Sequence, residues 1–164
     1  MPDLDLLDLL SADHQLLLAG APGVARVSQH LSVERDLLYP VIRHRVAGGE
    51  AVVAELRRQE RRLEDRLAAV EADPTPLEQE RLMEAIGDHA AQQEDLFARL
   101  RGLIPAEDLR APMETVPLSI GGAPTHAHPQ LAEGGPRGEL AEDVASVADH
   151  LRDRVHPDDR ARRG

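Results

Sequence analysis

Four stretches of this chain repeat their hydrophobic residues every three or four positions. In the first stretch Leu7, Leu10 and Leu17 fall on one side of a helix, and the other three stretches show the same spacing. This period is typical of amphipathic helices, which bury one apolar stripe and expose the opposite face. The pattern predicts four helices, over about residues 3–19, 23–46, 50–72 and 76–103.

Short clusters of Gly and Pro separate the four stretches, at residues 20–23, 47–49 and 73–76. Such clusters mark turns, and helices joined by connections this short lie antiparallel to their neighbours. We therefore expect an all-α fold, an antiparallel up-down four-helix bundle over residues 1–104.

The sequence changes character after residue 104. Residues 105–137 lose the helical period and are rich in Pro and Gly, which predicts a flexible, disordered linker. Residues 138–164 form a third region, with an amphipathic C-terminal helix over about 138–155 and a short tail.

The first helical hairpin, over residues 3–46, is shorter than the second, over residues 50–103, so we expect an apolar overhang on the second. The C-terminal helix would cover it, or would mediate self-association or binding of a protein partner.

Polar residues interrupt the apolar stripe of every helix in the bundle. Ionisable side chains are rarely buried without a partner or a metal ion. In an antiparallel hairpin, residues equidistant from the turn face one another, and pairing across each turn brings the interrupting residues to one level of the bundle. These residues are His14, His30 with Glu34, Glu60, and His89 with Gln93.

Imidazole and carboxylate groups at one level of a bundle are the ligands of di-metal sites, and this donor set suits iron or manganese. His30 and Glu34 are one helical turn apart, so both can face the bundle interior. Three other histidines are weaker candidates for metal ligands. We interpret His44 as exposed, and His126 and His128 as linker residues. The sequence thus predicts a metal site inside the bundle.

Composition and charge exclude several other functions. The chain has 164 residues and no Cys, which excludes thiolate ligands and disulfides. A net charge of −11 makes nucleic acid an unsuitable partner. Continuous apolar runs are too short to span a membrane, and an acidic start is unlike a signal peptide, so a cytoplasmic location is expected. Every cationic residue is Arg, which we interpret as the coding bias of a GC-rich bacterial genome.

These residues resemble a known family, the hemerythrin-like (HHE cation-binding) proteins. The resemblance rests on residues 29–34, which read Gln-His-Leu-Ser-Val-Glu, on Leu-Tyr-Pro at 38–40, and on Asp-His at 88–89 running to Leu-Phe at 96–97. It implies a four-helix bundle that holds a non-haem di-iron centre. Members of the family are associated with oxygen or nitric oxide chemistry, iron sensing, or the repair of iron–sulfur centres.

Two positions depart from the family pattern. Glu60 stands where the third helix normally has a His, and an anionic ligand there would favour the oxidised metal. On the last helix Gln93 stands in the usual His-x3-Glu position, while Glu94 has the His-x4-Asp spacing of true hemerythrins. We prefer Glu94 as the ligand and keep Gln93 as its rival. The expected ligands are His14, His30, Glu34, Glu60, His89 and Glu94, with Gln93 as the alternative.

Three functions remain open from the sequence. The first is a metal-binding protein that handles iron and a small diatomic ligand or peroxide. The second is a metal-free family member that acts as a protein–protein interaction module. The third is an oxidising di-iron enzyme, but no Ser-His-Asp order or phosphate-binding loop is present, and we assign no catalytic residue. The first function is preferred.

Overall fold

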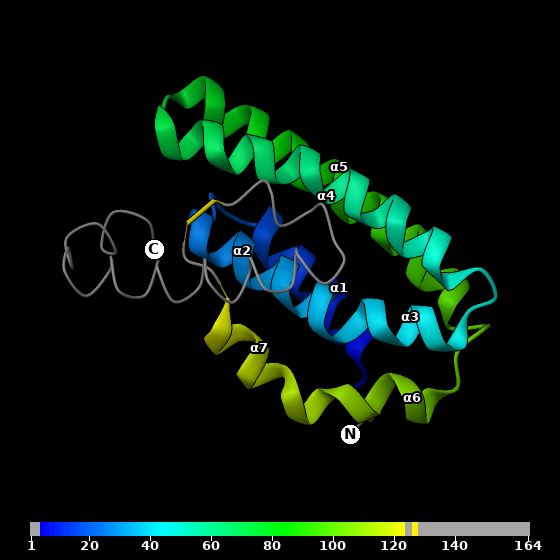
Figure 1. The fold of residues 1–164 in the computed structure, drawn as a ribbon. Coiled ribbons are helices and arrows are strands. Elements are labelled where there is room, and N and C mark those ends of the chain that lie inside the picture. Colours follow the sequence, from blue (N-terminus) through cyan, green and yellow to red (C-terminus); the bar gives the residue numbers. More distant parts are fainter. Residues whose placement is uncertain (1–3, 124–125, 128–164) are drawn as a thin grey trace.

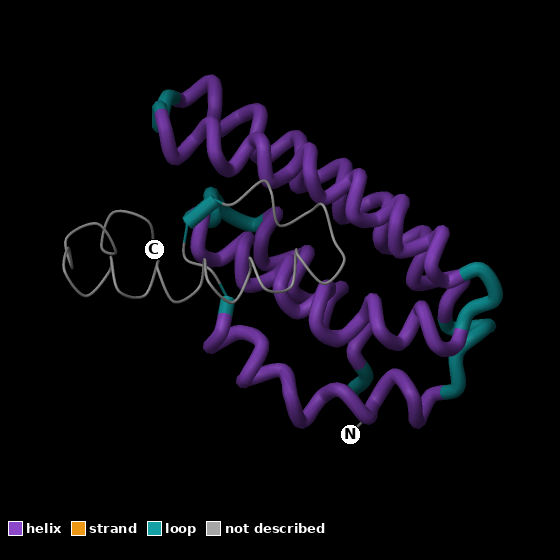
Figure 2. Tube along the Cα trace, viewed as in Figure 1, coloured by secondary structure: helices purple, strands orange, loops and turns teal. Residues whose placement is uncertain are grey.

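The computed structural model describes residues 4–123 and 126–127. Within these residues the chain is helical and contains no strand (Figures 1 and 2). The elements are α1 (Leu6–Leu18), α2 (Val24–Val33), the π-helical turn η1 (Glu34–Leu38), α3 (Tyr39–Arg45), α4 (Gly49–Ala72), α5 (Pro76–Leu100), α6 (Ala106–Arg110), the 3-10 turn η2 (Ala111–Thr115) and α7 (Val116–Gly122).

The bundle has four helices, because α2, η1 and α3 follow one another without a break and act as the second helix. Helix α1 packs against α2 and α5, α4 packs against α3 and α5, and the four helices thereby close a ring (Figure 1). The prediction of an all-α up-down bundle is confirmed. None of the helices in the described part of the chain combines the length and hydrophobicity needed to cross a membrane.

Local sequence signals explain where the helices begin. Asp5 caps α1, because its side chain accepts hydrogen bonds from the backbone N–H groups of Leu7 and Asp8. Thr75 caps α5 in the same way. Gly48 precedes α4 with a φ of 71°, a left-handed conformation that favours glycine. These caps fix the helix ends and hence the level of each side chain along the bundle.

The second helix contains a π-helical turn that begins at Glu34, the second residue of the predicted His30–Glu34 pair. The N–H of Tyr39 bonds to the carbonyl of Glu34, five residues earlier. Pro40 follows, and it has no N–H to continue the regular ladder. A π turn adds a residue to the helix and shifts the register, so neighbouring side chains that a regular helix would separate can both face inward. Glu34 and Arg35 are accordingly both buried.

The hydrophobic core consists of two clusters that lie on either side of a polar layer. One cluster includes Leu10 and Leu96, and the other includes Leu17 and Ile86. His14 falls between the two leucines of α1 in sequence, and it is itself buried. The apolar ends of the bundle therefore hold the polar layer away from bulk solvent.

The prediction of a flexible linker over residues 105–137 is wrong for residues 106–122, which form α6, η2 and α7. Leu109 joins the first core cluster, and α7 packs against α2. Pro112 and Pro117 misled the sequence interpretation because they lie in the first turns of η2 and α7, where a missing N–H costs nothing. The predicted helix at 138–155 lies outside the described residues.

His126 is buried, contrary to its interpretation as a linker residue. Its Nδ1 pairs with Glu71 near the end of α4, and the N–H of Ala127 donates to the same carboxylate at 2.8 Å. Ala127 also packs against the second core cluster, which contains Val70 and Leu82 from the far end of the α4–α5 hairpin. Residues 126–127 therefore contact the hairpin end that we expected to overhang. His128 lies outside the described residues.

Candidate metal centre

Four buried side chains from three parts of the bundle meet in the polar layer. They are His14 from α1, His30 and Glu34 from the second helix, and His89 from α5. One ligand atom from each lies within 4.8 Å of the ligand atoms of the other three. All four residues are at least 94% buried, since the most exposed of them, His89, has 6% of its surface accessible. From the sequence we expected these four residues at one level of the bundle, and the structure brings them together there.

The imidazole Nε2 atoms gather around one oxygen of Glu34. From Glu34 Oε1, the distance is 3.2 Å to His89 Nε2, 3.3 Å to His30 Nε2 and 4.0 Å to His14 Nε2. The Nε2 atoms of His30 and His89 are 3.4 Å apart. Three nitrogen donors and one carboxylate oxygen around a common point are a suitable donor set for a transition-metal ion.

Two carboxylates outside this group orient its histidines. Asp13 Oδ2 lies 2.8 Å from His30 Nδ1, and Glu94 Oε1 lies 2.8 Å from His14 Nδ1. When Nδ1 carries the proton and donates a hydrogen bond to a carboxylate, the Nε2 lone pair is free to bind a metal ion. Arg26 and Ser11 in turn hold Asp13 and Glu94. This carboxylate–histidine arrangement is common around protein-bound metals.

Several buried polar atoms in the layer have no hydrogen-bond partner among the described residues. They are His14 Nε2, Gln93 Oε1 and the carboxylate oxygens of Glu34. Glu34 Oε1 is nevertheless at ion-pair distance from His30 and His89. Leaving a buried donor or acceptor unsatisfied costs about 1–3 kcal/mol, and more for a charged group. A cation bound among these atoms would remove that cost, so the residues present fit a metal ion.

The charges of the metal-free site favour an ionic arrangement. Burial disfavours a charged His30, but the charge of Glu34 and the hydrogen bond that His30 donates to Asp13 outweigh it and raise the pKa of His30 to about 9. Burial likewise opposes ionisation of Glu34, but the charges of His89 and His30 lower its pKa well below the usual range. For His14, burial and the neighbouring charge of His30 lower the pKa. A proton on His30 therefore supplies part of the positive charge that a metal ion would bring.

Glu60 reaches the same level of the bundle but lies outside the group of four. Its Oε1 accepts a hydrogen bond from the Tyr39 hydroxyl at 2.7 Å, and its Oε2 accepts one from Arg35 Nε at 3.1 Å. Arg35 Nη2 also donates to Glu64 Oε1 at 2.8 Å. Glu60 was expected to bind metal and to favour its oxidised state, but its charge is instead paired with a guanidinium.

Glu94 and Gln93 also differ from the expected roles. The carboxylate of Glu94 contacts Nδ1 of His14 and so holds that ring. Glu94 lies outside the group of four, with 47% of its side chain exposed. Gln93 is buried, and it follows His89 by one helical turn. Sequence reasoning did not assign roles to Asp13 and Arg35. Asp13 directly precedes His14, a signal that was available, whereas the inward position of Arg35 depends on the π turn.

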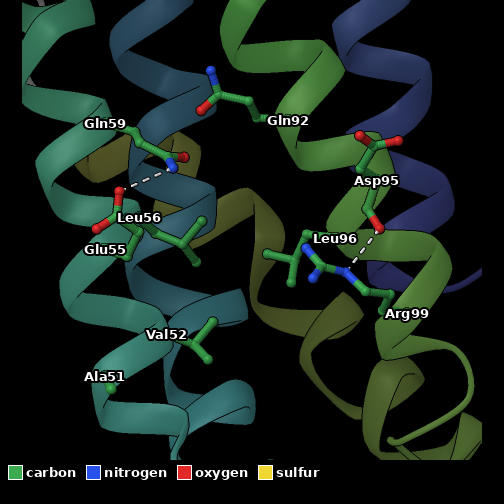
Figure 3. Close-up of a pocket in the computed structure, with 9 residues that line it drawn as sticks. All are labelled: Ala51, Val52, Glu55, Leu56, Gln59, Gln92, Asp95, Leu96 and Arg99. Atoms are coloured by element: carbon green, nitrogen blue, oxygen red, sulfur yellow. Dashed lines mark hydrogen bonds between the residues drawn. The ribbon is translucent and has the colours of Figure 1, made fainter.

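Helices of the bundle also line hollows in the described part of the chain. A groove of about 500 Å³ runs between α4 and α5, where Figure 3 shows Leu56 and Leu96 extending toward each other. A smaller hollow of about 210 Å³ lies between α1, α2 and α7. Its lining is mostly apolar, and it includes Asp13, the carboxylate that holds His30.

Comparison with protein families gives a match that covers the bundle. Residues 6–100 match the family model described as the hemerythrin HHE cation-binding domain. No curated protein and no solved structure matches the chain. The matched residues begin with α1 and end with α5, so they contain the whole bundle and all four residues of the polar group. The chain belongs to the hemerythrin HHE cation-binding domain family.

Proposed function

We propose that this chain binds a metal ion through His14, His30, Glu34 and His89, and that the ion is iron. The observation that carries the proposal is the convergence of three Nε2 atoms and a carboxylate oxygen, with unpartnered atoms on Glu34 and His14. Mixed imidazole and carboxylate donors suit iron, although the same donors accept manganese or zinc. Gln93 supplements this set, because its buried Oε1 lacks a partner whereas Glu94 is engaged by His14.

The role that we propose is the handling or sensing of iron, oxygen, nitric oxide or peroxide. A bound iron ion would supply a site for such a small ligand. The protein itself holds the imidazoles through Asp13 and Glu94 and keeps the layer dry between two apolar clusters. The apolar hollow beside Asp13 supports a small, weakly polar ligand such as oxygen or nitric oxide. We favour a binding role over a catalytic role, because Asp13 and Glu94, the two carboxylates beside the imidazoles, are used to hold those rings in place.

Elemental analysis tests this function. The full chain is expressed in iron-supplemented medium, and its metal content is measured as isolated and after anaerobic reconstitution. We expect iron in a definite ratio to protein, because the donors are assembled by the fold. Iron below about 0.2 per chain, with none gained on reconstitution, would contradict the proposal.

A pair of histidine variants locates the site. His30→Ala removes a donor and keeps a residue that favours helix, so metal content should fall sharply. His44→Ala is the matched control, because His44 lies on α3 and is exposed. Equal metal content in the two variants would place the site elsewhere, and the contact between His126 and Glu71 would then be the first region to examine.

The alternative function is a metal-free interaction module. The groove between α4 and α5 favours it, because polar side chains border a floor that contains Val52, Leu56 and Leu96 (Figure 3). A metal-free chain that folds and is stable would support this alternative over the first proposal.

A further inference from the structure

The family implies a di-iron centre, and the donors of this chain do not fit one. We infer that the chain holds a single metal ion, and that the guanidinium of Arg35 takes the place of a second. The inference rests on the proposed function, since it concerns the number of ions at the same site. It reverses the di-metal expectation drawn from the sequence.

The convergent donors suffice for one ion only. Among the described residues, one group of His, Asp and Glu side chains comes together closely enough to hold a metal, and it has four members. Glu34 Oε1 lies within 4.0 Å of each of the three Nε2 atoms. Two ions need more donors and bridging carboxylates that offset their mutual repulsion, and Glu34 is the only carboxylate in the group.

The carboxylates that could serve a second ion are already bound by a cation. Glu60 and Glu64 are both buried, and Arg35 bonds to the two of them, at 3.1 and 2.8 Å. The second oxygen of Glu60 is taken by the hydroxyl of Tyr39. A metal ion at this place would have to displace a guanidinium that is itself buried among these groups.

The charges of this region balance without any metal. Glu60 and Glu64 contribute two negative charges, Arg35 contributes one positive charge, and Arg57 adds another from its position over the ring of Tyr39, 5.6 Å from the centroid. The guanidinium group stays charged at every pH a folded protein meets. Among these four side chains of the described part of the chain, the charges cancel, so the carboxylates attract a second cation less strongly.

The fold explains how Arg35 reaches this place. It directly follows Glu34, and side chains of consecutive residues diverge on a regular helix. Both residues lie in the π turn η1, and both are buried. The turn therefore directs Glu34 to the histidines and Arg35 to the carboxylates of α4, so one segment supplies a ligand and a permanent cation side by side.

Metal stoichiometry tests the inference. Metal-free full-length protein is titrated anaerobically with Fe²⁺, and with Co²⁺ as a spectroscopic probe, and bound metal is counted after equilibrium dialysis. We expect saturation at one ion per chain and an electron paramagnetic resonance signal of isolated high-spin Co²⁺. Two ions per chain, or a Co²⁺ signal lost through coupling between ions, would overturn the inference and leave the proposed function standing. No bound ion would overturn both.

Two variants at Arg35 test the role of the guanidinium. Arg35→Met frees Glu60 and Glu64, so it should bind two ions per chain, and divalent ions should raise its melting temperature more than that of the unmodified protein. Arg35→Lys keeps a positive charge at this position and should still bind one. If Arg35→Met folds and still binds one ion, the guanidinium does not exclude a second. If it does not fold, the Co²⁺ signal of the unmodified protein decides the number of ions.

Discussion

Two buried polar groups lie side by side in the bundle, and they differ in what surrounds their carboxylates. In the histidine group of His14, His30, Glu34 and His89, three imidazole nitrogens surround one oxygen of Glu34, and His14 Nε2 has no hydrogen-bond partner among the described residues. The neighbouring group consists of Arg35, Glu60 and Glu64, and we call it the arginine group. Both oxygens of Glu60 accept hydrogen bonds, and Arg35 bonds to both Glu60 and Glu64. A carboxylate surrounded by imidazole nitrogens indicates a place for a metal ion, whereas carboxylates held by a guanidinium indicate a structural ion pair. The sequence pattern assigned Glu60 of the arginine group to the metal as well.

The largest expected effect is on stability, from breaking the arginine group. Arg35→Met leaves two buried carboxylates with less positive charge, and breaking a buried ion pair in this way costs about 3–5 kcal/mol. Urea denaturation of the metal-free variant and of the unmodified protein measures the difference. Arg43→Met is the control, because Arg43 is only partly buried and its pair with Glu50 is largely exposed. Equal losses in the two variants would contradict the structural role of the group.

The next effect is on metal affinity, from Glu34. Glu34→Gln replaces the only carboxylate of the histidine group by a weaker neutral ligand, so affinity should fall by about 100-fold or more. Glu60→Gln is the matched change in the arginine group and should leave affinity within about 10-fold, because Glu60 does not contact the metal in our account. Competition with a chelator of known affinity measures both. Similar losses in the two variants would erase the distinction between the groups.

A smaller effect is expected from the carboxylates that orient the histidines. Asp13→Asn should lower metal affinity about 10- to 100-fold, the usual consequence of weakening a partner of a metal-bound histidine. Glu94→Gln should act in the same direction but less strongly, because Glu94 is about half exposed and its charge is better screened. The same chelator competition applies. A loss for Glu94→Gln larger than that for Glu34→Gln would restore Glu94 as a direct ligand.

The pH dependence of the metal-free protein distinguishes the groups further. The pKa of His30 is raised from 6.5 to about 9 in the folded state, so its contribution to stability is fully present below pH 6.5 and is lost as the pH rises through 9. The pKa values of Asp13 and Glu34 are lowered, so their contributions are present above the ordinary carboxyl range and are lost on acidification. Metal binding requires a neutral His30, so metal affinity should rise over the window in which stability falls. Denaturation measures the stability and metal titration measures the affinity, both between pH 6 and 9. Stability and metal affinity that changed in the same direction with pH would contradict this prediction.

The sequence predicted the helices and most of the histidine group, because both depend on the regular period of a helix. His14, His30 and His89 interrupt apolar stripes, and pairing across the turns was enough to bring them together. Glu60 was expected among them by the same rule. Pairing across the turns gives the level of a residue along the bundle axis, but it does not give the partner of its side chain. The partners of Glu60 are its neighbours Arg35 and Tyr39.

Two other features could not be obtained from periodicity. The π turn shifts the register inside the second helix, so a pattern that assumes a regular helix does not predict that Glu34 and Arg35 face inward together. The helices at 106–122 are short, and η2 and α7 contain Pro in their first turns, so the segment looks like a linker in sequence. Their apolar contacts, such as that of Leu109 with the core, are made with distant residues that a local pattern does not include.

The central claim is that one metal ion binds among His14, His30, Glu34 and His89. Crystals of the metal-loaded protein, measured at the absorption edge of the metal, would locate each bound ion by its anomalous scattering. We predict one peak per chain, within bonding distance of the three Nε2 atoms and the Glu34 carboxylate, with Arg35 still bound to Glu60. A second peak between Glu60 and Glu64, or a single peak away from the three histidines, would contradict the account.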